Sequence, residues 1–159
     1  MMAVTGLAAT DPACVVATWF GAGRMPRAPG TCGSLAALPF AAALAWLGGP
    51  WLLLLATLAV FGLGVWASDR YMAACGLHDP GAIVVDEVVG QWLTLALLPL
   101  TPIAYLLGFV LFRIADMVKP WPAAWIDRTM AGGVGVMLDD VVAAIYAGGL
   151  ALAVLVWLP

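Results

Sequence analysis

Three long stretches without a charged side chain constrain this chain more than any other feature. They run from Leu35 to Ser68, from Val88 to Phe112 and from Val141 to Pro159. Only 9% of the residues are charged, against about 25% in soluble globular domains, and the mean hydropathy is +1.07. Stretches this long and this apolar are typical of helices in a membrane, so we expect an all-α membrane protein.

The first two stretches are expected to form helical hairpins. Leu35–Ser68 is too long for one membrane span, which needs about 20 residues, and its LGGPW segment (Leu47–Trp51) favours a turn. The second stretch has about the length of one span, but Pro99 and Pro102 interrupt its middle, where proline ends or kinks a helix. A single span over residues 88–112 remains the alternative. The third stretch predicts one span.

Two hairpins would bring every charged cluster to one face of the membrane. This arrangement is favourable because a charge inside the bilayer costs about 2.5–3.5 kcal/mol on the mildest scale. The basic residues would share that face, and their positive charge predicts that it is cytoplasmic. We therefore expect a compact helical membrane protein with about five membrane-embedded or hairpin helices, one cytoplasm-facing polar cluster and a single domain over residues 1–159.

The composition argues against several other classes of protein. The net charge of −3 provides no basic surface for nucleic acid. The N-terminal segment lacks a positive region followed by a continuous apolar core, so we expect no cleaved signal peptide. Cys14, Cys32 and Cys75 match no zinc or CxxC spacing, and we expect free thiols that pack as small apolar groups.

The glycine-rich segment RAPGTCGSLAALP (Arg27–Pro39) runs into an apolar helix. Its donors would cradle a phosphate at the helix N-terminus; they are the backbone N–H groups of Gly30, Thr31 and Gly33 and the hydroxyl of Ser34. No lysine follows the second glycine, so this is not a Walker A loop. Ser34 as an ordinary N-cap is the simpler interpretation of the segment alone, and the nearby Arg24 and Arg27 strengthen the alternative of phosphate binding.

Two adjacent acids stand at the beginning of the apolar segment in HDPGAIVVDEVVGQW. Asp86 and Glu87 are favoured there by the helix dipole alone. Glu87 shares a helix face with Gln91, however, and polar groups that continue into a membrane are usually functional. Carboxylates are the ligands that Mg²⁺ prefers, so we favour a metal site here.

A second pair of acids, Asp139 and Asp140, ends the segment GGVGVMLDD. One acid would be enough to cap a helix, and two adjacent acids repel each other unless a positive charge lies between them. A divalent ion shared with Asp86 or Glu87 would supply that charge. All four carboxylates are therefore predicted metal ligands.

The segment FRIADMVKPWP places Arg113, Asp116 and Lys119 three residues apart. A surface ladder of ion pairs explains this spacing, as does snorkelling of the two basic side chains to the interface. In a chain with so few basic residues, phosphate binding is the more specific interpretation, because arginine binds phosphate through two parallel hydrogen bonds and lysine as a point charge.

Four segments, in this order, resemble the phosphatidylglycerophosphatase A family: APGTCGSLAALP, DPGAIVVDEVVGQWL, FRIADMVKPWP and DR followed by GGVGVMLDD. The resemblance extends from about Phe20 to Gly148 and implies an all-helical enzyme of the bacterial inner membrane. Such an enzyme uses Mg²⁺ to hydrolyse phosphatidylglycerophosphate to phosphatidylglycerol and phosphate. His78 and Ala115 depart from the residues usual in the family, and neither departure removes a candidate ligand.

The motifs and the resemblance together give the expected site. The catalytic residues are Asp86, Glu87, Arg113, Asp116, Lys119, Asp139 and Asp140, and the substrate-binding residues are Arg24, Gly30, Thr31, Gly33, Ser34, Arg113 and Lys119. Whether a carboxylate acts as base or as nucleophile stays open. The expected partners are the lipid substrate and the membrane, with no nucleic acid. The rival hypothesis is a small ion-coupled transporter or a membrane scaffold, and the nearly complete lack of polar residues along the spans argues against it.

Overall fold

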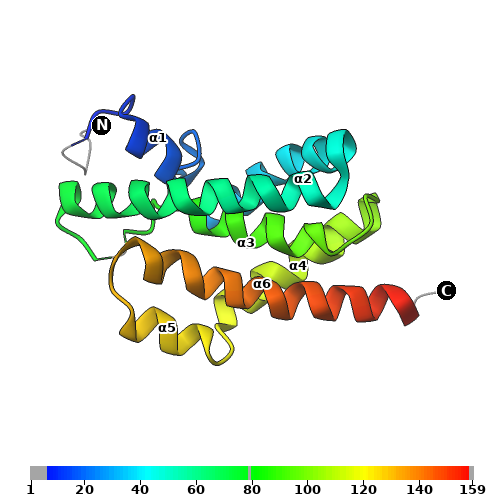
Figure 1. The fold of residues 1–159 in the computed structure, drawn as a ribbon. Helices are drawn as coiled ribbons and strands as arrows, with labels where there is room; N and C mark the ends of the chain where they lie inside the picture. The colour runs from blue at the N-terminus through cyan, green and yellow to red at the C-terminus, as the bar shows by residue number, and fades with distance from the viewer. Residues whose placement is uncertain (1–6, 79, 158–159) are drawn as a thin grey trace.

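The computed structural model describes residues 7–78 and 80–157 of the chain. In these two ranges it contains six α-helices, one 3₁₀ turn and no strand (Figure 1), which confirms the all-α prediction. The elements are α1 (Pro12–Ala17), η1 (Ala22–Arg24), α2 (Pro29–Cys75), α3 (Val85–Ala96), α4 (Pro102–Val118), α5 (Ala123–Thr129) and α6 (Gly132–Trp157). Among the described helices, α2 and α6 are long and apolar enough to cross a membrane.

Helix α2 is the first predicted hairpin. Its helical geometry breaks at Gly48 (φ −145°, ψ 18°) and Gly49 (φ 67°, ψ −166°), inside the LGGPW segment. The positive φ of Gly49 is a conformation that glycine adopts without steric cost. The two halves fold back on each other, because Gly33 in the first half and Gly64 in the second both lie against residues 84–85.

Helices α3 and α4 are the second predicted hairpin. Helix α3 ends at Ala96, and α4 begins at Pro102 after Thr101, whose hydroxyl accepts a hydrogen bond from the Ala104 N–H at 3.3 Å. The two helices pack against each other. The chain therefore turns back between them, and the single-span alternative for residues 88–112 is wrong.

Helix α3 lies at the centre of the bundle, where it contacts α2, α4 and α6. Most of its side chains are buried, including the polar Gln91 and Thr94. The Trp92 indole N–H donates to the Ala37 carbonyl at 2.9 Å and ties α3 to the first half of α2. Because α3 is central, Asp86 and Glu87 in its first turn are surrounded by the other helices.

Helix α6 begins earlier than its apolar stretch suggests. It starts at Gly132, and the Gly133 N–H donates to Asp69 Oδ1 at 2.6 Å. Asp139 and Asp140 consequently lie inside the helix, so the interpretation of these acids as caps is wrong. Ser34 likewise lies inside α2, which begins at Pro29, and it is not an N-cap.

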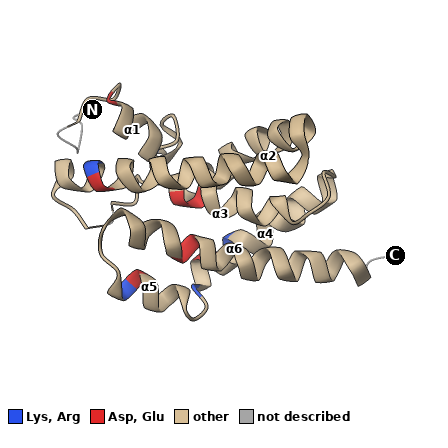
Figure 2. Cartoon of the chain, in the orientation of Figure 1, with Lys and Arg blue, Asp and Glu red and all other residues tan. Residues whose placement is uncertain are grey.

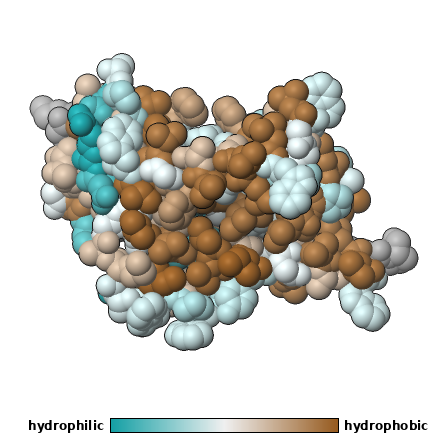
Figure 3. Space-filling view, viewed as in Figure 1, coloured by the Kyte–Doolittle hydropathy of each residue, from teal (hydrophilic) through white to brown (hydrophobic). Residues whose placement is uncertain are grey.

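Charged residues gather at one end of the molecule. Figure 2 shows them in the half that holds α1, α5 and the starts of α3 and α6, whereas the half with the α2 bend and the end of α6 carries none in this view. The space-filling view shows a largely apolar surface over the rest of this face (Figure 3). The predicted single polar cluster is present, because both hairpins return to the same end.

Candidate functional site

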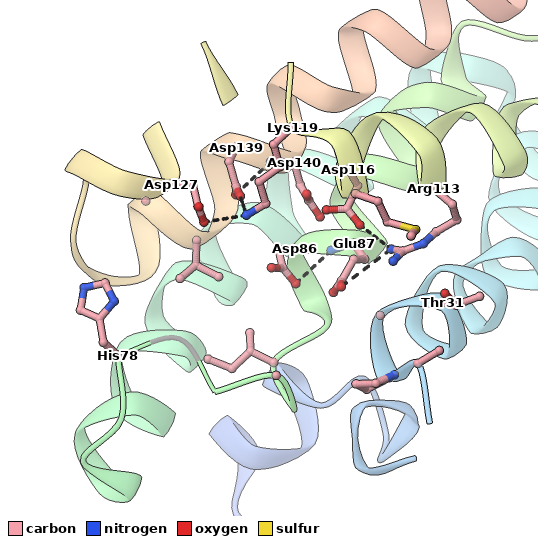
Figure 4. A pocket seen from close by; sticks show the side chains of 18 of the residues that line it. Thr31, His78, Asp86, Glu87, Arg113, Asp116, Lys119, Asp127, Asp139 and Asp140 are labelled. Carbon is pink, nitrogen blue, oxygen red and sulfur yellow. Dashed lines mark hydrogen bonds and ion pairs between the residues drawn. The ribbon is translucent and has the colours of Figure 1, made fainter. Parts of the chain in front are cut away.

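A cavity of about 600 Å³ lies at the charged end of the bundle (Figure 4). It is formed by the start of α2, the start of α3, the end of α4, α5 and the first half of α6. Its charged lining residues are Asp86, Glu87, Arg113, Asp116, Lys119, Asp127, Asp139 and Asp140. The structure therefore brings together all seven of the predicted catalytic side chains from three helices and the α4–α5 loop.

Three carboxylates converge inside this cavity. One oxygen each from Asp86, Glu87 and Asp140 lies within 4.8 Å of the others. Glu87 Oε2 and Asp140 Oδ2 are buried without a hydrogen-bond partner among the described residues. Burial raises the pKa of Glu87 to about 8, and the neighbouring carboxylates of Asp140 and Asp116 act in the same direction. A hard divalent cation fits this group, because it would satisfy the buried oxygens and offset their repulsion.

Asp139, the fourth predicted metal ligand, lies with Lys119 instead. Lys119 Nζ donates to Asp139 Oδ2 at 2.8 Å and to Asp127 Oδ1 at 2.6 Å. Burial alone would lower the pKa of Lys119, but the hydrogen bonds and charges of these two acids raise it above its ordinary value. Lys119 therefore stays protonated and joins α5 and α6 at one side of the cavity.

Arg113 holds two acids of the site in place. Its Nη1 lies 2.7 Å from Asp116 Oδ2, 3.8 Å from Glu87 Oε1 and 3.2 Å from the Ser34 hydroxyl oxygen, to which it donates. All four side chains are buried or nearly so. The guanidinium thus orients Glu87 toward the other carboxylates and places a positive charge at the cavity wall.

The start of α2 closes the opposite wall. The first intrahelical bond of α2 joins the Cys32 N–H to the Ala28 carbonyl at 3.0 Å, so the N–H groups of Gly30 and Thr31 precede it and have no partner within the helix. Both residues line the cavity. A side chain at Gly30 would collide with the Glu87 carboxylate and lie 3.2 Å from Arg113 Nη2, so only glycine allows this approach.

The other predicted substrate-binding residues lie outside the cavity lining. Gly33 packs against Val84, and Ser34 contacts the site only through Arg113. Arg24 Nη2 lies 2.8 Å from the Cys14 sulfur, next to α1. Of the predicted binding loop, Gly30 and Thr31 are the part that faces the carboxylates.

Two titratable side chains in the cavity lining, Asp127 and His78, were not predicted as site residues from the sequence. Asp127 reaches Lys119 from α5, and His78 lies at the exposed rim. A signal for Asp127 exists in the sequence, because an acid follows Lys119 after a short Pro-Trp-Pro turn that brings the chain back. His78 carries no such signal, since its position depends on how the loop between α2 and α3 folds.

The fold and the cavity define a class of protein, namely a helical membrane protein with a polar site at one end of an apolar bundle. Comparison with protein families then identifies the particular family. Residues 15–155 match the family model of phosphatidylglycerophosphatase A, and the chain belongs to this family. No solved structure matches the chain.

Curated relatives agree with the family match. The chain is 42% identical to phosphatidylglycerophosphatase A of Escherichia coli, over 94% of this chain and 87% of that protein. It is 39% identical to the protein of the same name from Haemophilus influenzae, over 93% of this chain and 91% of the relative. A Bacteroides thetaiotaomicron protein described as a putative phosphatidylinositol-3-phosphatase is 40% identical over 84% of this chain and 87% of its own length. The chain is therefore a phosphatase, and the rival hypothesis of a transporter loses its support.

Proposed function

We propose that this protein hydrolyses phosphatidylglycerophosphate to phosphatidylglycerol and phosphate, with Mg²⁺ bound by Asp86, Glu87 and Asp140. The observation that carries the proposal is the convergence of these three carboxylates within 4.8 Å, in one cavity with Arg113, Lys119 and the start of α2. The names of the Escherichia coli and Haemophilus influenzae relatives support the choice of substrate.

The acidic and basic groups of the cavity would have different roles in the reaction. A divalent ion supplies Lewis-acid polarisation of the phosphoryl group when bound. The N–H groups of Gly30 and Thr31, at the positive end of α2, would bind phosphate oxygens. Lys119 would neutralise phosphate charge from the other side, while Asp139 and Asp127 hold its ammonium group in position. Arg113 would act mainly by orienting Glu87 and Asp116.

We further propose a multi-pass arrangement in the bacterial inner membrane with the cavity facing the cytoplasm. Both hairpins return to the charged end, and all six basic residues belong to the charged clusters of the sequence. Such a distribution favours the cytoplasmic side. Reporter fusions test it: a fusion at the Gly48–Gly49 bend should report the periplasm, and one in the 119–122 loop should report the cytoplasm.

The direct test of the function is phosphate release by the purified protein in lipid micelles. The substrates are phosphatidylglycerophosphate, phosphatidic acid and phosphatidylinositol 3-phosphate, each measured with chelator and again with excess Mg²⁺. We expect the first substrate to be preferred and the chelator to abolish release. Asp140→Asn should lose activity, whereas Asp11→Asn, at an exposed pair with Arg70 outside the cavity, should keep it. Preference for the phosphoinositide, or full activity without Mg²⁺, would contradict the proposal.

A further inference from the structure

The corner between α4 and α5 exposes large apolar side chains beside the cavity. Met117 is 75% exposed, Val118 70%, Trp121 76% and Trp125 55%. We call these four residues the α4–α5 surface. They lie within nine residues of one another, and large exposed apolar side chains gathered in this way mark a site of interaction.

The backbone under this surface is fixed. Ala123 and Ile126 of α5 are buried, and α5 packs on α6. The Tyr146 hydroxyl on α6 donates to the Trp121 carbonyl at 2.9 Å. The Trp125 ring is therefore carried by a packed helix, and the backbone of Trp121, in the loop before α5, is tied to α6.

A second group of exposed tryptophans lies at the opposite end of the bundle. Trp46 and Trp51 flank the α2 bend and are 77% and 76% exposed, and Trp157 near the end of α6 is 86% exposed. Trp66, at 45% exposure, stands one turn before Asp69 at the charged end. Within α2, Trp51 and Trp66 are separated by about 22 Å of continuous helix, a distance of the same order as the ~30 Å hydrocarbon core of a bilayer.

Tryptophan is enriched at both interfaces of a membrane, where the ring meets headgroups and acyl chains together. We propose that the α4–α5 surface lies in the headgroup region of the leaflet on the cavity side, with Trp46, Trp51 and Trp157 at the opposite interface. The partner is the lipid bilayer itself, and this assignment does not depend on the phosphatase chemistry. The basic Arg128 in the last turn of α5 suits an anionic headgroup layer.

This placement brings the lipid headgroups of the leaflet next to the cavity that holds the carboxylates. Met117 belongs to the exposed surface and also lines the cavity. Asp127, on the same short helix as Trp125, binds Lys119. A lipid that lies on the α4–α5 surface is therefore next to the cavity, and its headgroup can enter without leaving the interface.

Fluorotryptophan incorporated at all eight tryptophan positions tests the assignment by fluorine NMR. The full chain is reconstituted in nanodiscs of equimolar phosphatidylethanolamine and phosphatidylglycerol, and single Trp→Phe variants assign the resonances. Three paramagnetic probes are compared: a lipid with a doxyl group near the carbonyl end of its chain, a lipid with a doxyl group at the methyl end, and a water-soluble gadolinium chelate. Trp92, which is only 3% exposed, is the internal control.

The expected result is that the carbonyl-end lipid broadens the Trp121 and Trp125 resonances severalfold more than the methyl-end lipid does, as it does for Trp51 and Trp157. Trp92 should change least with all three probes. If only the soluble chelate broadens Trp121 and Trp125, the α4–α5 surface faces water and the proposal is wrong. Stronger broadening by the methyl-end lipid would place the surface in the bilayer centre and would also overturn it.

Discussion

Asp69, near the end of α2, accepts a hydrogen bond at 2.6 Å from the N–H of Gly133 at the start of α6. This single contact joins two helices that are separated by the whole of α3, α4 and α5 in the sequence. It satisfies one of the free N–H groups at the α6 N-terminus, where a negative charge is also favoured by the helix dipole. The start of α6 fixes where Asp139 and Asp140 fall two turns later.

Replacing Asp69 with alanine should therefore destabilise the protein. Loss of an N-terminal cap costs about 1 kcal/mol, so we expect a lower Tm by thermal unfolding in detergent, with a smaller decrease for Asp69→Asn, which retains an oxygen acceptor. Arg70→Ala is the matched control, because its ion pair with Asp11 is exposed and such pairs contribute about 0–1 kcal/mol. Equal Tm values for Asp69→Ala and the wild type would show that the contact has no energetic weight.

The arrangement of the hairpins could be predicted from the sequence, whereas the start of α6 could not. LGGPW lies inside an uncharged stretch that is too long for one span, so the local signal and the membrane thickness agree there. The second stretch has the length of one span, and only the Pro99–Pro102 pair indicates its turn. The GGVG segment has low intrinsic helix propensity, and it is helical because Asp69 caps it from another element. Tertiary contacts of this kind leave no local signal.

The candidate site likewise combines features that could be predicted from the sequence with features that could not. The carboxylates and cations of the site could be predicted because charged residues are scarce in this chain, and a charge near a membrane is costly unless it has a function. Their pairing was not: the sequence does not show that Lys119 binds Asp139, or that Asp140 alone of the second acidic pair joins Asp86 and Glu87. Adjacent helix positions point about 100° apart, so Asp139 and Asp140 can face different partners, whereas Asp86 and Glu87 in the first turn of α3 still converge on one point.

Gly30→Ala should separate activity from stability. The added methyl group would meet the Glu87 carboxylate and Arg113 Nη2, which are the ends of side chains and can shift without unfolding the helix. We expect phosphate release to fall by at least about tenfold, as displacement of a catalytic group by about 1 Å does, with little change in Tm. Gly62→Ala is the control, since nothing lies within 4 Å of the added methyl group and alanine favours the helix. Full activity of Gly30→Ala would mean that the position of Glu87 is not critical.

Lys119 should matter far more to activity than its exposed partner Asp127. The side chain of Asp139 is only 7% exposed, against 36% for Asp127. Lys119→Met removes the cation beside the buried acid, and we expect kcat to fall by about 10²-fold or more, as for loss of one charge-stabilising group. Asp127→Asn should change kcat by less than about tenfold, because exposed pairs contribute about 0–1 kcal/mol. Equal losses in the two variants would indicate that the site needs both acids on Lys119.

Removal of divalent cations should make stability depend on pH through Glu87. Burial raises its pKa from 4.5 to about 8, so between these values the folded protein binds more protons than the unfolded chain, and stability falls as the pH rises. With chelator present, Tm should therefore decrease from pH 5 to pH 8. Added Mg²⁺ binds the deprotonated carboxylates and should raise Tm more at pH 8 than at pH 5. A hundredfold excess of Mg²⁺ over Kd corresponds to a stabilisation of about 2.7 kcal/mol.

Glu87→Gln should flatten the pH dependence of Tm measured with chelator and reduce the effect of Mg²⁺ on Tm. A Tm that responds to neither pH nor Mg²⁺ would exclude a cation site formed by Glu87.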